Sequence, residues 1–188
     1  MKLKLGFLVS FLIFVIGCNT KKEYPETLLN KTFHCKADLN FNNLKSTKDI
    51  KNNFTIQLPE NWKTNTYFDD KQSDIYTADT TKTLNSTYIL NVSHYQEAIK
   101  LDQELVEKSN SYPNLELIFS EFEKFKGKPS YWHFSKGYKE SIDYQMLNLY
   151  VKLDDNAYVV ITLEIYGNEN VQVRTCEAIQ LINTIEFL

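Results

Sequence analysis

Glycine, arginine and histidine are all scarce in this chain of 188 residues. Five glycines are present, and only Gly127, Gly137 and Gly167 lie beyond the first seventeen residues. A Gly-rich phosphate loop or a dinucleotide-binding fingerprint needs closely spaced glycines, so the sequence excludes both. The G-x-S-x-G sequence, which is the commonest serine-hydrolase signature, does not occur either. The chain therefore has no linear motif of these enzyme and nucleotide-binding classes.

Arginine and positive charge are also limited. Arg174 is the one arginine, and 24 acidic residues outnumber 21 basic ones. Proteins that bind nucleic acids cluster basic side chains and favour arginine for contacts with phosphates and bases. We therefore expect no nucleic-acid partner.

The residue types that bind metals are not arranged as ligands. His34, His94 and His133 are widely separated, and none has the close Cys/His spacing or the i, i+4 spacing of a zinc site. The acidic pairs Asp69-Asp70 and Asp154-Asp155 are typical of solvated turns, and the loop after Asp154 lacks the glycine and glutamate of an EF-hand. We expect no metal and no cofactor, although the three histidines could still meet in space.

Residues 1–17 have the pattern of a secretory signal peptide. Lys2 and Lys4 precede a nearly unbroken apolar run from Leu5 to Ile16, and a small residue, Gly17, follows. A transmembrane helix needs about 20 apolar residues, and this run is shorter. The pattern predicts that the chain is exported.

The end of this segment, Val15-Ile16-Gly17-Cys18, resembles the lipobox of bacterial lipoproteins. The resemblance implies that a thioether-linked diacylglycerol is added to Cys18, which becomes the first residue of the mature chain and later carries palmitate-type acyl chains. Two or more acyl chains hold a protein stably at a bilayer. We expect a lipid anchor in the bacterial cell envelope. Basic rather than acidic residues follow Cys18, which favours the outer membrane and its periplasmic side.

Two cysteines remain after Cys18. Cys35 and Cys176 form an even pair in a chain expected to reach an oxidising compartment, where disulfides persist. One interpretation is therefore a disulfide between the N-terminal tail and a C-terminal helix. The alternative is two unpaired thiols, with Cys176 packed as a small apolar residue. The sequence leaves both open.

The rest of the chain predicts one folded domain of the α+β class. Residues 18–51 are polar and lack periodicity, as in a tether, and residues 52–188 form the domain. Helical spacing of apolar residues occurs at 99–109 and 171–183. Alternating or continuous apolar residues predict strands at 54–58, 74–79, 87–95, 115–125, 131–134, 142–153 and 157–166. Strands that follow one another predict an antiparallel sheet of about six to seven strands with helices packed on its faces.

The start of this domain resembles a known family. Phe54 to Trp62 read F-T-I-Q-L-P-E-N-W, which is similar to the F-x-I-x-L-P-x-x-W opening of PsbP-like domains, and the turn Gly127-Lys128-Pro129 and the ending from Ile179 to Phe187 agree. The resemblance spans residues 52–188 and implies an antiparallel sheet sandwiched between helices. Members include photosystem accessory subunits, a nuclear-transport relative that binds a Ran-type GTPase, and bacterial lipoproteins. It implies a binding or accessory role and assigns no residue.

Three functions are compatible with these observations. The first is a non-catalytic module that binds another envelope protein, with no catalytic residues. The second is a carrier of a small apolar ligand, for which Tyr67-Phe68, Tyr76, Tyr131-Trp132 and Tyr138 could line a groove, although such residues more often fill a core. The third is an enzyme whose catalytic groups converge without a linear motif. An exposed apolar patch would favour the first, and an apolar cavity the second.

Overall fold

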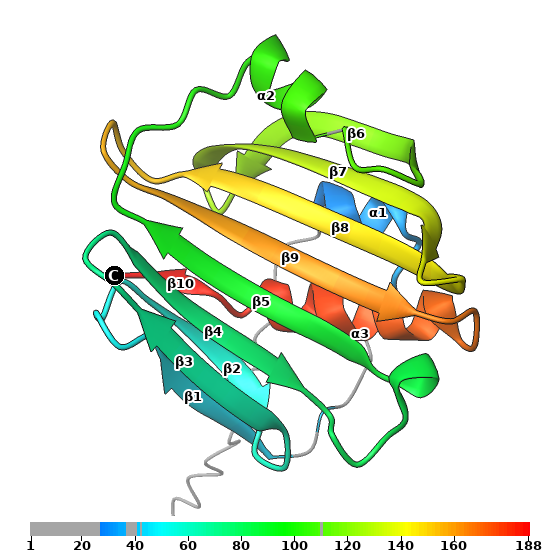
Figure 1. The fold of residues 1–188 in the computed structure, drawn as a ribbon. Helices are drawn as coiled ribbons and strands as arrows, with labels where there is room; N and C mark the ends of the chain where they lie inside the picture. The colour runs from blue at the N-terminus through cyan, green and yellow to red at the C-terminus, as the bar shows by residue number, and fades with distance from the viewer. Residues whose placement is uncertain (1–26, 37–40, 42, 110) are drawn as a thin grey trace, which may run out of the picture.

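A seven-stranded antiparallel sheet and a three-stranded sheet form the fold in the computed structural model, which describes residues 27–36, 41, 43–109 and 111–188. The strand orders are β3-β4-β5-β9-β8-β7-β6 and β1-β2-β10. Figure 1 shows the elements, which are α1 (Leu28–Thr32), β1 (Leu44–Lys48), β2 (Phe54–Pro59), β3 (Lys63–Phe68), β4 (Gln72–Ala78), η1 (Leu84–Ser86), β5 (Tyr88–Tyr95), α2 (Gln103–Ser109), β6 (Leu115–Phe125), β7 (Lys128–Lys139), β8 (Ile142–Lys152), β9 (Tyr158–Tyr166), α3 (Val171–Ile182) and β10 (Glu186–Phe187). This architecture confirms the predicted α+β class and antiparallel sheet. Within the described part of the chain, no helix has the length and apolar character needed to span a bilayer.

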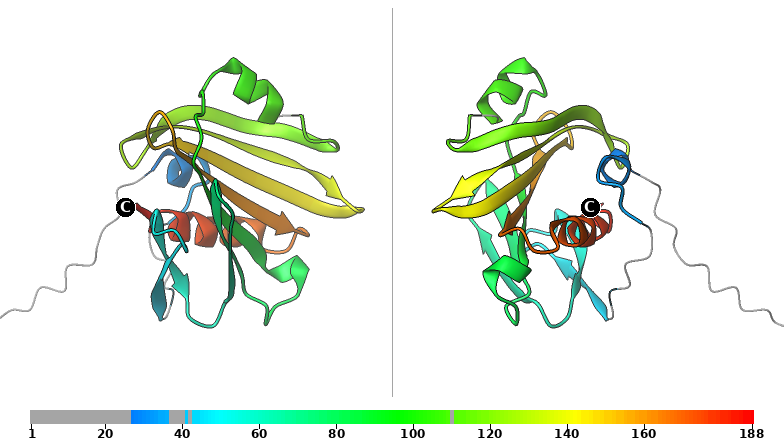
Figure 2. Two further views of the ribbon diagram at one scale, coloured as in Figure 1. Left: turned by 60° about the vertical axis from the view of Figure 1, so that its left-hand side comes forward. Right: turned by 90° about the vertical axis from the view of Figure 1, so that its right-hand side faces the viewer.

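The large sheet has two different faces. Its inner face packs on α3 and α1, and Figure 2 shows the sheet curving around both helices. Its outer face is the one turned toward the viewer in Figure 1. In the central strand β9 the alternate residues Val159, Ile161, Leu163 and Ile165 are fully buried against the inner layer. The main hydrophobic core therefore lies between the large sheet, α3 and the small sheet.

Helix α3 joins the two sheets. Its buried residues include the stripe predicted from helical spacing, Thr175, Ala178, Ile179 and Ile182. Arg174 is also buried, and its guanidinium donates hydrogen bonds to the carbonyls of Thr87, Tyr166 and Gly167 at 2.7, 2.8 and 3.2 Å. The single arginine of the chain thus ties α3 to the ends of β5 and β9. In this fold Arg174 makes contacts within the domain.

Part of the predicted tether, residues 18–51, belongs to the folded domain. Leu29 and Phe33, in and after α1, are buried in the core, and β1 pairs with β2. Asp49 is also buried, and it accepts hydrogen bonds from the backbone N–H groups of Asn53 and Phe54 and from the Ser73 hydroxyl. The boundary predicted at residue 52 is therefore too late, because polar segments are ordered by tertiary contacts that leave no periodicity. Cys18 and the signal peptide lie outside the described residues.

Other differences concern element ends. β3 was not predicted, because its residues are polar and its pairing with β4 defines it. The helix predicted at 99–109 begins at Gln103, after Asp102 accepts a hydrogen bond from the backbone N–H of Leu105. The short strand predicted at 131–134 extends over twelve residues as β7, since β6 and β8 pair with it on both sides. Apart from β3, these differences change the lengths of predicted elements and leave the order of those elements intact.

Candidate functional site

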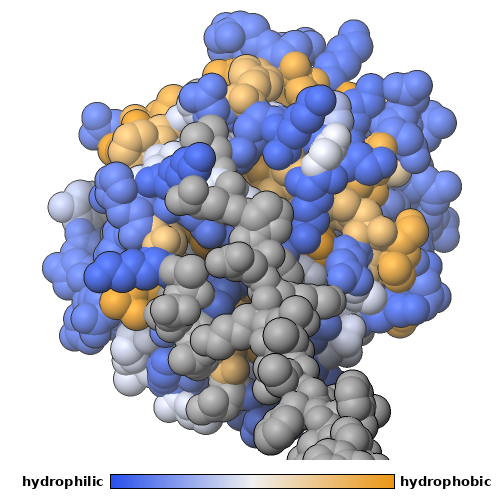
Figure 3. Space-filling model, turned by 180° about the vertical axis from the view of Figure 1, so that it is seen from behind, coloured by the Kyte–Doolittle hydropathy of each residue, from blue (hydrophilic) through white to orange (hydrophobic). Residues whose placement is uncertain are grey.

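The unpaired edge of β6 exposes large apolar side chains. β6 is the last strand of the large sheet, and among the residues that the structure describes only β7 pairs with it. Four large apolar residues of β6 are 37% to 50% exposed: Leu117, Ile118, Phe119 and Phe122. In Figure 3, hydrophobic residues gather along the upper margin of the molecule, below α2 and over β6. We define this surface, residues 115–125 along the side away from β7, as the β6 edge.

A β-bulge determines which face of the large sheet each side chain of β6 occupies. The register with β7 shifts between Leu117 and Phe119, as the change of alternation in the sequence suggests. Before the shift, Leu117 lies opposite Ser135 on the outer face, and after it Phe122 lies opposite Tyr131 on the same face. Glutamates therefore occupy the inner face, beside Phe119: Glu116, Glu121 and Glu123. An uninterrupted alternation would have mixed these two groups, because residues 117 and 122 differ in parity.

Beneath the inner face of β6 lies a small hollow of about 140 Å³. Phe33 lines it, and its ring lies 4.9 Å from the ring of Phe134 and 6.4 Å from that of Phe119. Gln145 also lines the hollow, and its side-chain oxygen is buried without a hydrogen-bond partner among the described residues. The remaining lining residues come from α1, β7 and α3: Thr32, His34, Lys136, Val171, Gln172 and Thr175.

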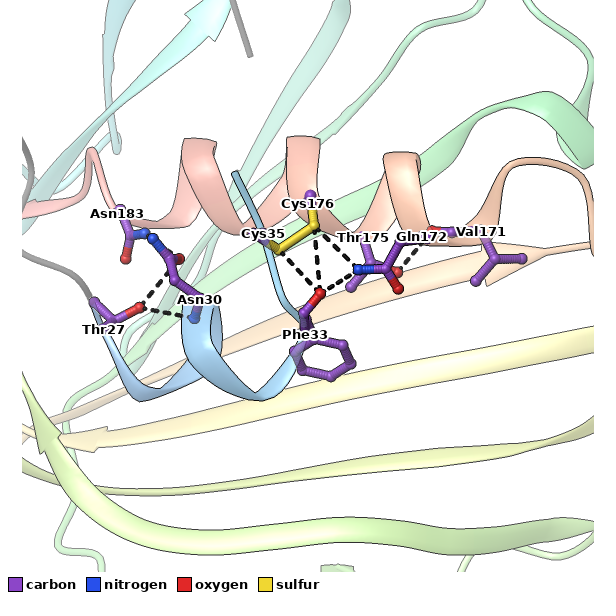
Figure 4. The surroundings of a disulfide bond; sticks show 9 residues. All are labelled: Thr27, Asn30, Phe33, Cys35, Val171, Gln172, Thr175, Cys176 and Asn183. Carbon is purple, nitrogen blue, oxygen red and sulfur yellow. Dashed lines mark hydrogen bonds between the residues drawn. A yellow bond between two sulfur atoms is a disulfide. The ribbon is translucent and has the colours of Figure 1, made fainter. Parts of the chain in front are cut away.

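A disulfide fixes α1, which contributes lining residues to this hollow. Cys35 and Cys176 are joined, which is the first of the two alternatives left by the sequence. Figure 4 shows that Phe33, two residues before Cys35, turns its carbonyl toward the Gln172 side chain, which donates a hydrogen bond to it. At the other end of α1, Asn183 donates a hydrogen bond to Asn30 at 3.1 Å. Helix α1 is thus attached to α3 at both ends, and Phe33 is fixed beneath β6 and β7.

A buried histidine lies on the outer face of the large sheet, on the strand that pairs with β6. His133 on β7 is fully buried, and its Nε2 accepts a hydrogen bond from Asn148, whose own carbonyl oxygen accepts one from Thr162 at 2.7 Å. Burial lowers the pKa of His133 to about 4, so the ring is neutral near pH 7. Three tyrosine rings stack around the imidazole, those of Tyr112, Tyr131 and Tyr150. This packing gives β6 a rigid neighbour.

The histidines and acidic pairs occupy separate places. His34 follows α1, His94 lies on β5 and His133 on β7. No group of three or more His, Cys, Asp or Glu that could hold a metal occurs among the residues that the structure describes. Asp69 accepts hydrogen bonds from the backbone N–H groups of two following residues, which lowers its pKa, and Asp155 pairs with a lysine at 2.8 Å. Both acidic pairs lie in turns, as expected.

One group of ionisable side chains converges on the outer face. Lys139 Nζ lies 2.7 Å from the Tyr166 hydroxyl and 3.1 Å from the Glu164 carboxylate, and Tyr166 donates to the same carboxylate oxygen. The hydrogen bond with Tyr166 raises the pKa of Lys139, although burial opposes it. Burial raises the pKa of Glu164, but hydrogen bonds from Tyr166, Lys139 and Tyr144 outweigh it and hold the pKa below the usual value. Both charges are therefore stabilised, whereas a catalytic base or nucleophile needs a lysine whose pKa is lowered.

A cleft of about 660 Å³ lies at one end of the large sheet. Its lining is mainly polar and charged, and it includes Lys51, Lys71 and Lys128. Two of these ammonium groups donate to backbone carbonyls, Lys51 to Asp70 and Lys128 to Leu153. The lining differs from the apolar cavity expected of a carrier for apolar ligands.

Sequence reasoning did not single out the β6 edge. The sequence predicted a strand at 115–125 and a change of parity within it, but the strand order decides which strand lies at an edge. The tyrosines and tryptophan considered for a groove are divided instead. Tyr131 and Trp132 are buried, whereas Tyr67, Phe68, Tyr76 and Tyr138 are 54%, 62%, 40% and 62% exposed. The rings of Tyr67 and Tyr76 lie 5.9 Å apart on β3 and β4, whereas Tyr138 lies on β7. One feature of the sequence could have pointed to this edge. The run Leu115–Phe119 is apolar except for one glutamate, and two more glutamates follow it.

Comparisons with known proteins identify the fold. No family model matches the chain, and no curated protein matches its sequence. Among solved structures, the PsbP protein CyanoP from Synechocystis sp. PCC 6803 is similar with a TM-score of 0.58 and 11% identity, over 82% of this chain and 97% of that one. A point mutant of protein Mog1 is similar with a TM-score of 0.51 and 10% identity, over 78% and 96% of the two chains. The fold is PsbP-like, as the resemblance implied.

Proposed function

We propose that this chain is a non-catalytic binding module of the bacterial cell envelope, anchored through lipid on Cys18, which contacts a partner protein through the β6 edge. The observation that supports the proposal is the exposure of Leu117, Ile118, Phe119 and Phe122 on the edge strand β6. Exposed apolar residues that lie together on a soluble domain are typical of an interaction site.

The remaining chemistry supports binding over catalysis. The converging group around Lys139 and Glu164 forms a closed set of hydrogen bonds, and His133 is buried and neutral. Binding is also compatible with the PsbP-like fold, which supplies a rigid sheet and imposes no chemistry of its own.

The partner is tested by site-specific photo-crosslinking in living cells. A photoreactive amino acid replaces Ile118 on β6 or, as the matched control, Thr66 on β3, which is exposed at the opposite edge of the same sheet. We expect a reproducible crosslink to one envelope protein from position 118 only, and loss of that crosslink when Phe122→Lys is added. Equal products from both positions, or none from position 118, would contradict the proposal.

The anchor has its own test. Radioactive palmitate is expected to label the wild-type chain, and Cys18→Ser is expected to abolish the label. The variant Cys35→Ser is the control, because its cysteine lies in the folded domain. Labelling that persists in Cys18→Ser would contradict lipidation at this position.

A further inference from the structure

We infer that the β6 edge binds its partner by strand addition, and that the added segment is an extended peptide in which apolar and basic side chains alternate. This inference rests on the proposed binding function and specifies its partner. Three observations carry it: the unpaired backbone of β6, the separation of its side chains between two faces, and the hollow beneath the inner face.

The backbone of β6 offers hydrogen-bonding groups along one side. β6 has eleven residues, and among the described strands only β7 pairs with it. An edge strand presents a row of backbone N–H and C=O groups that a further strand can pair with. Peptides that bind by adding a strand gain affinity from these main-chain hydrogen bonds and specificity from alternate side chains. The β6 edge has the length and exposure for this mode.

The side chains of β6 determine what the added strand carries. On the outer face its neighbours include Leu117 and Phe122, which favour apolar side chains, together with Ser120 and Lys124. On the inner face its neighbours include Glu116 and Glu121. Both carboxylates are exposed, but Glu116 lies opposite the cation Lys136 of β7, whereas Glu121 lies opposite Trp132. Glu121 is therefore the carboxylate that we expect a basic side chain of the partner to meet. Because side chains alternate along a strand, the partner alternates between apolar and basic residues.

The hollow can receive the aliphatic part of a long side chain. A lysine or arginine that points to the inner face lays its aliphatic part along the rings of Phe119 and Phe33. The rest of the lining is mainly polar and includes Gln145 and Lys136, whose ammonium lies 5.5 Å from the centre of the Phe134 ring. The rings of Phe33 and Phe119 therefore supply the apolar contact, and the charge of the partner is matched by the carboxylates of β6.

A second copy of this chain fits the edge less well. Two β6 strands that paired with each other would bring two acidic inner faces together, each with Glu116, Glu121 and Glu123. Like charges that face each other across paired strands are destabilising. The charge of the edge favours a basic partner strand.

The test uses the full chain purified in detergent and fluorescent nine-residue peptides. The parent peptide alternates valine and lysine, and a second peptide alternates valine and glutamate. We expect the glutamate peptide to bind at least tenfold more weakly by fluorescence anisotropy. The variant Glu121→Lys should reverse this preference. The control Glu60→Lys makes the same charge change in the turn after β2 and should leave both affinities unchanged.

Backbone pairing is tested by N-methylation. In a strand, alternate residues direct their N–H groups to opposite edges, so methylating all valines blocks one edge and methylating all lysines blocks the other. We expect one methylated peptide to bind like the parent and the other to lose binding. Equal affinity of the two methylated peptides, or no binding of the parent, would overturn strand addition.

The outcomes separate this inference from the proposed function. A crosslink from position 118 that Glu121→Lys does not weaken would overturn the basic strand and leave the binding function standing. Failure of the crosslink itself would remove the proposed function. Sedimentation of the chain alone at increasing concentration shows whether a second copy occupies the edge, and a dimer that Glu121→Lys strengthens would overturn the choice of partner.

Discussion

The two outer strands of the large sheet, β3 and β6, solve the same structural problem in different ways. β3 has six residues with the sequence K-T-N-T-Y-F, and β6 has eleven with the sequence L-E-L-I-F-S-E-F-E-K-F. Short length and polar residues, especially lysine, are the usual protection of an edge against unwanted pairing. β3 has this protection along most of its length, although Tyr67 and Phe68 are exposed at its end. The difference indicates that exposure at β6 is a specialised property of one edge.

The two ends of the sheet are also held by different interactions. Beside β6, the Cys35–Cys176 disulfide fixes α1 and places Phe33 under the sheet. Toward β3, the buried carboxylate of Asp49 binds the turn after β1 to Ser73 of β4 at 2.7 Å. One end thus depends on a covalent bond and the other on a charge. The predictions below test these two interactions separately and are ordered by the size of the change that we expect.

Removing the disulfide should weaken the β6 end most. The pair Cys35→Ser and Cys176→Ser opens a loop with a sequence separation of 141. The chain-entropy model gives a loss of about 5 kcal/mol in the free energy of unfolding for a loop of this size. Urea denaturation measures the loss, and hydrogen exchange should show the greatest local loss of protection in α1 and β7. Because the loss of chain entropy acts on the unfolded state, protection also falls in β3 and β4, and the absence of any additional loss in α1 and β7 would contradict the assignment of the disulfide to one end.

Removing the Asp49 carboxylate should weaken the opposite end. Asp49→Ala leaves the buried N–H groups of Asn53 and Phe54 and the Ser73 hydroxyl without their acceptor. We expect a loss of about 3 kcal/mol, since hydrogen bonds to a charged group are worth about 1.5–3 kcal/mol each and part of the loss is recovered by water. Hydrogen exchange should rise in β1, β2 and β4 and stay unchanged in β7. Asp155→Ala is the control, because its carboxylate is exposed in a turn.

Acid should weaken the β6 end through His133. The pKa of this histidine is about 4 in the folded chain and near 6.5 in the unfolded chain, so between these values the unfolded chain binds the additional proton. The stabilisation is complete above pH 6.5 and is lost as the pH falls toward 4, by about 3 kcal/mol at most. Denaturation at pH 7 and at pH 4.5 should show a smaller difference for His133→Phe than for the wild type. Equal pH dependence of the two proteins would contradict this origin.

Placing an apolar residue on β3 should give the smallest effect. Thr66→Ile adds one apolar side chain to the polar edge and is expected to leave the free energy of unfolding within about 0.5 kcal/mol of the wild type. If length and polarity protect β3, the variant should show only a slight increase in self-association by sedimentation. Strong association caused by this single change would show that β3 is as open to pairing as β6.

The sequence predicted the elements whose side chains alternate between core and solvent. Phe54, Ile56 and Leu58 of β2 are buried as expected, and so is the stripe of α3. β1 and β3 were not predicted, because polar residues such as those of L-K-S-T-K form a strand only when a neighbour supplies hydrogen bonds. Strands of this kind depend on tertiary contacts rather than on their own pattern.

The candidate site could be predicted only in part. The strand and the parity change at residues 115–125 follow from the order of apolar residues, and the pairing of Cys35 with Cys176 was one of two interpretations. The position of β6 at the edge and the hollow under Phe119 depend on how seven strands are ordered. That order is set by contacts between residues far apart in sequence, which a pattern of neighbours does not contain.

The disulfide also determines how the domain carries mechanical load. Cys35 and Cys176 enclose every strand from β1 to β9 in one covalent loop. A force applied between the two ends of the chain passes from residue 35 to residue 176 through the sulfur atoms and does not stretch the residues between them. Among the described elements, α1, the end of α3 and β10 are the ones that lie on the loaded path. If the proposed lipid anchor holds the domain by its N-terminal side, the sheet and its β6 edge keep their shape under tension that would otherwise unfold the strands one after another.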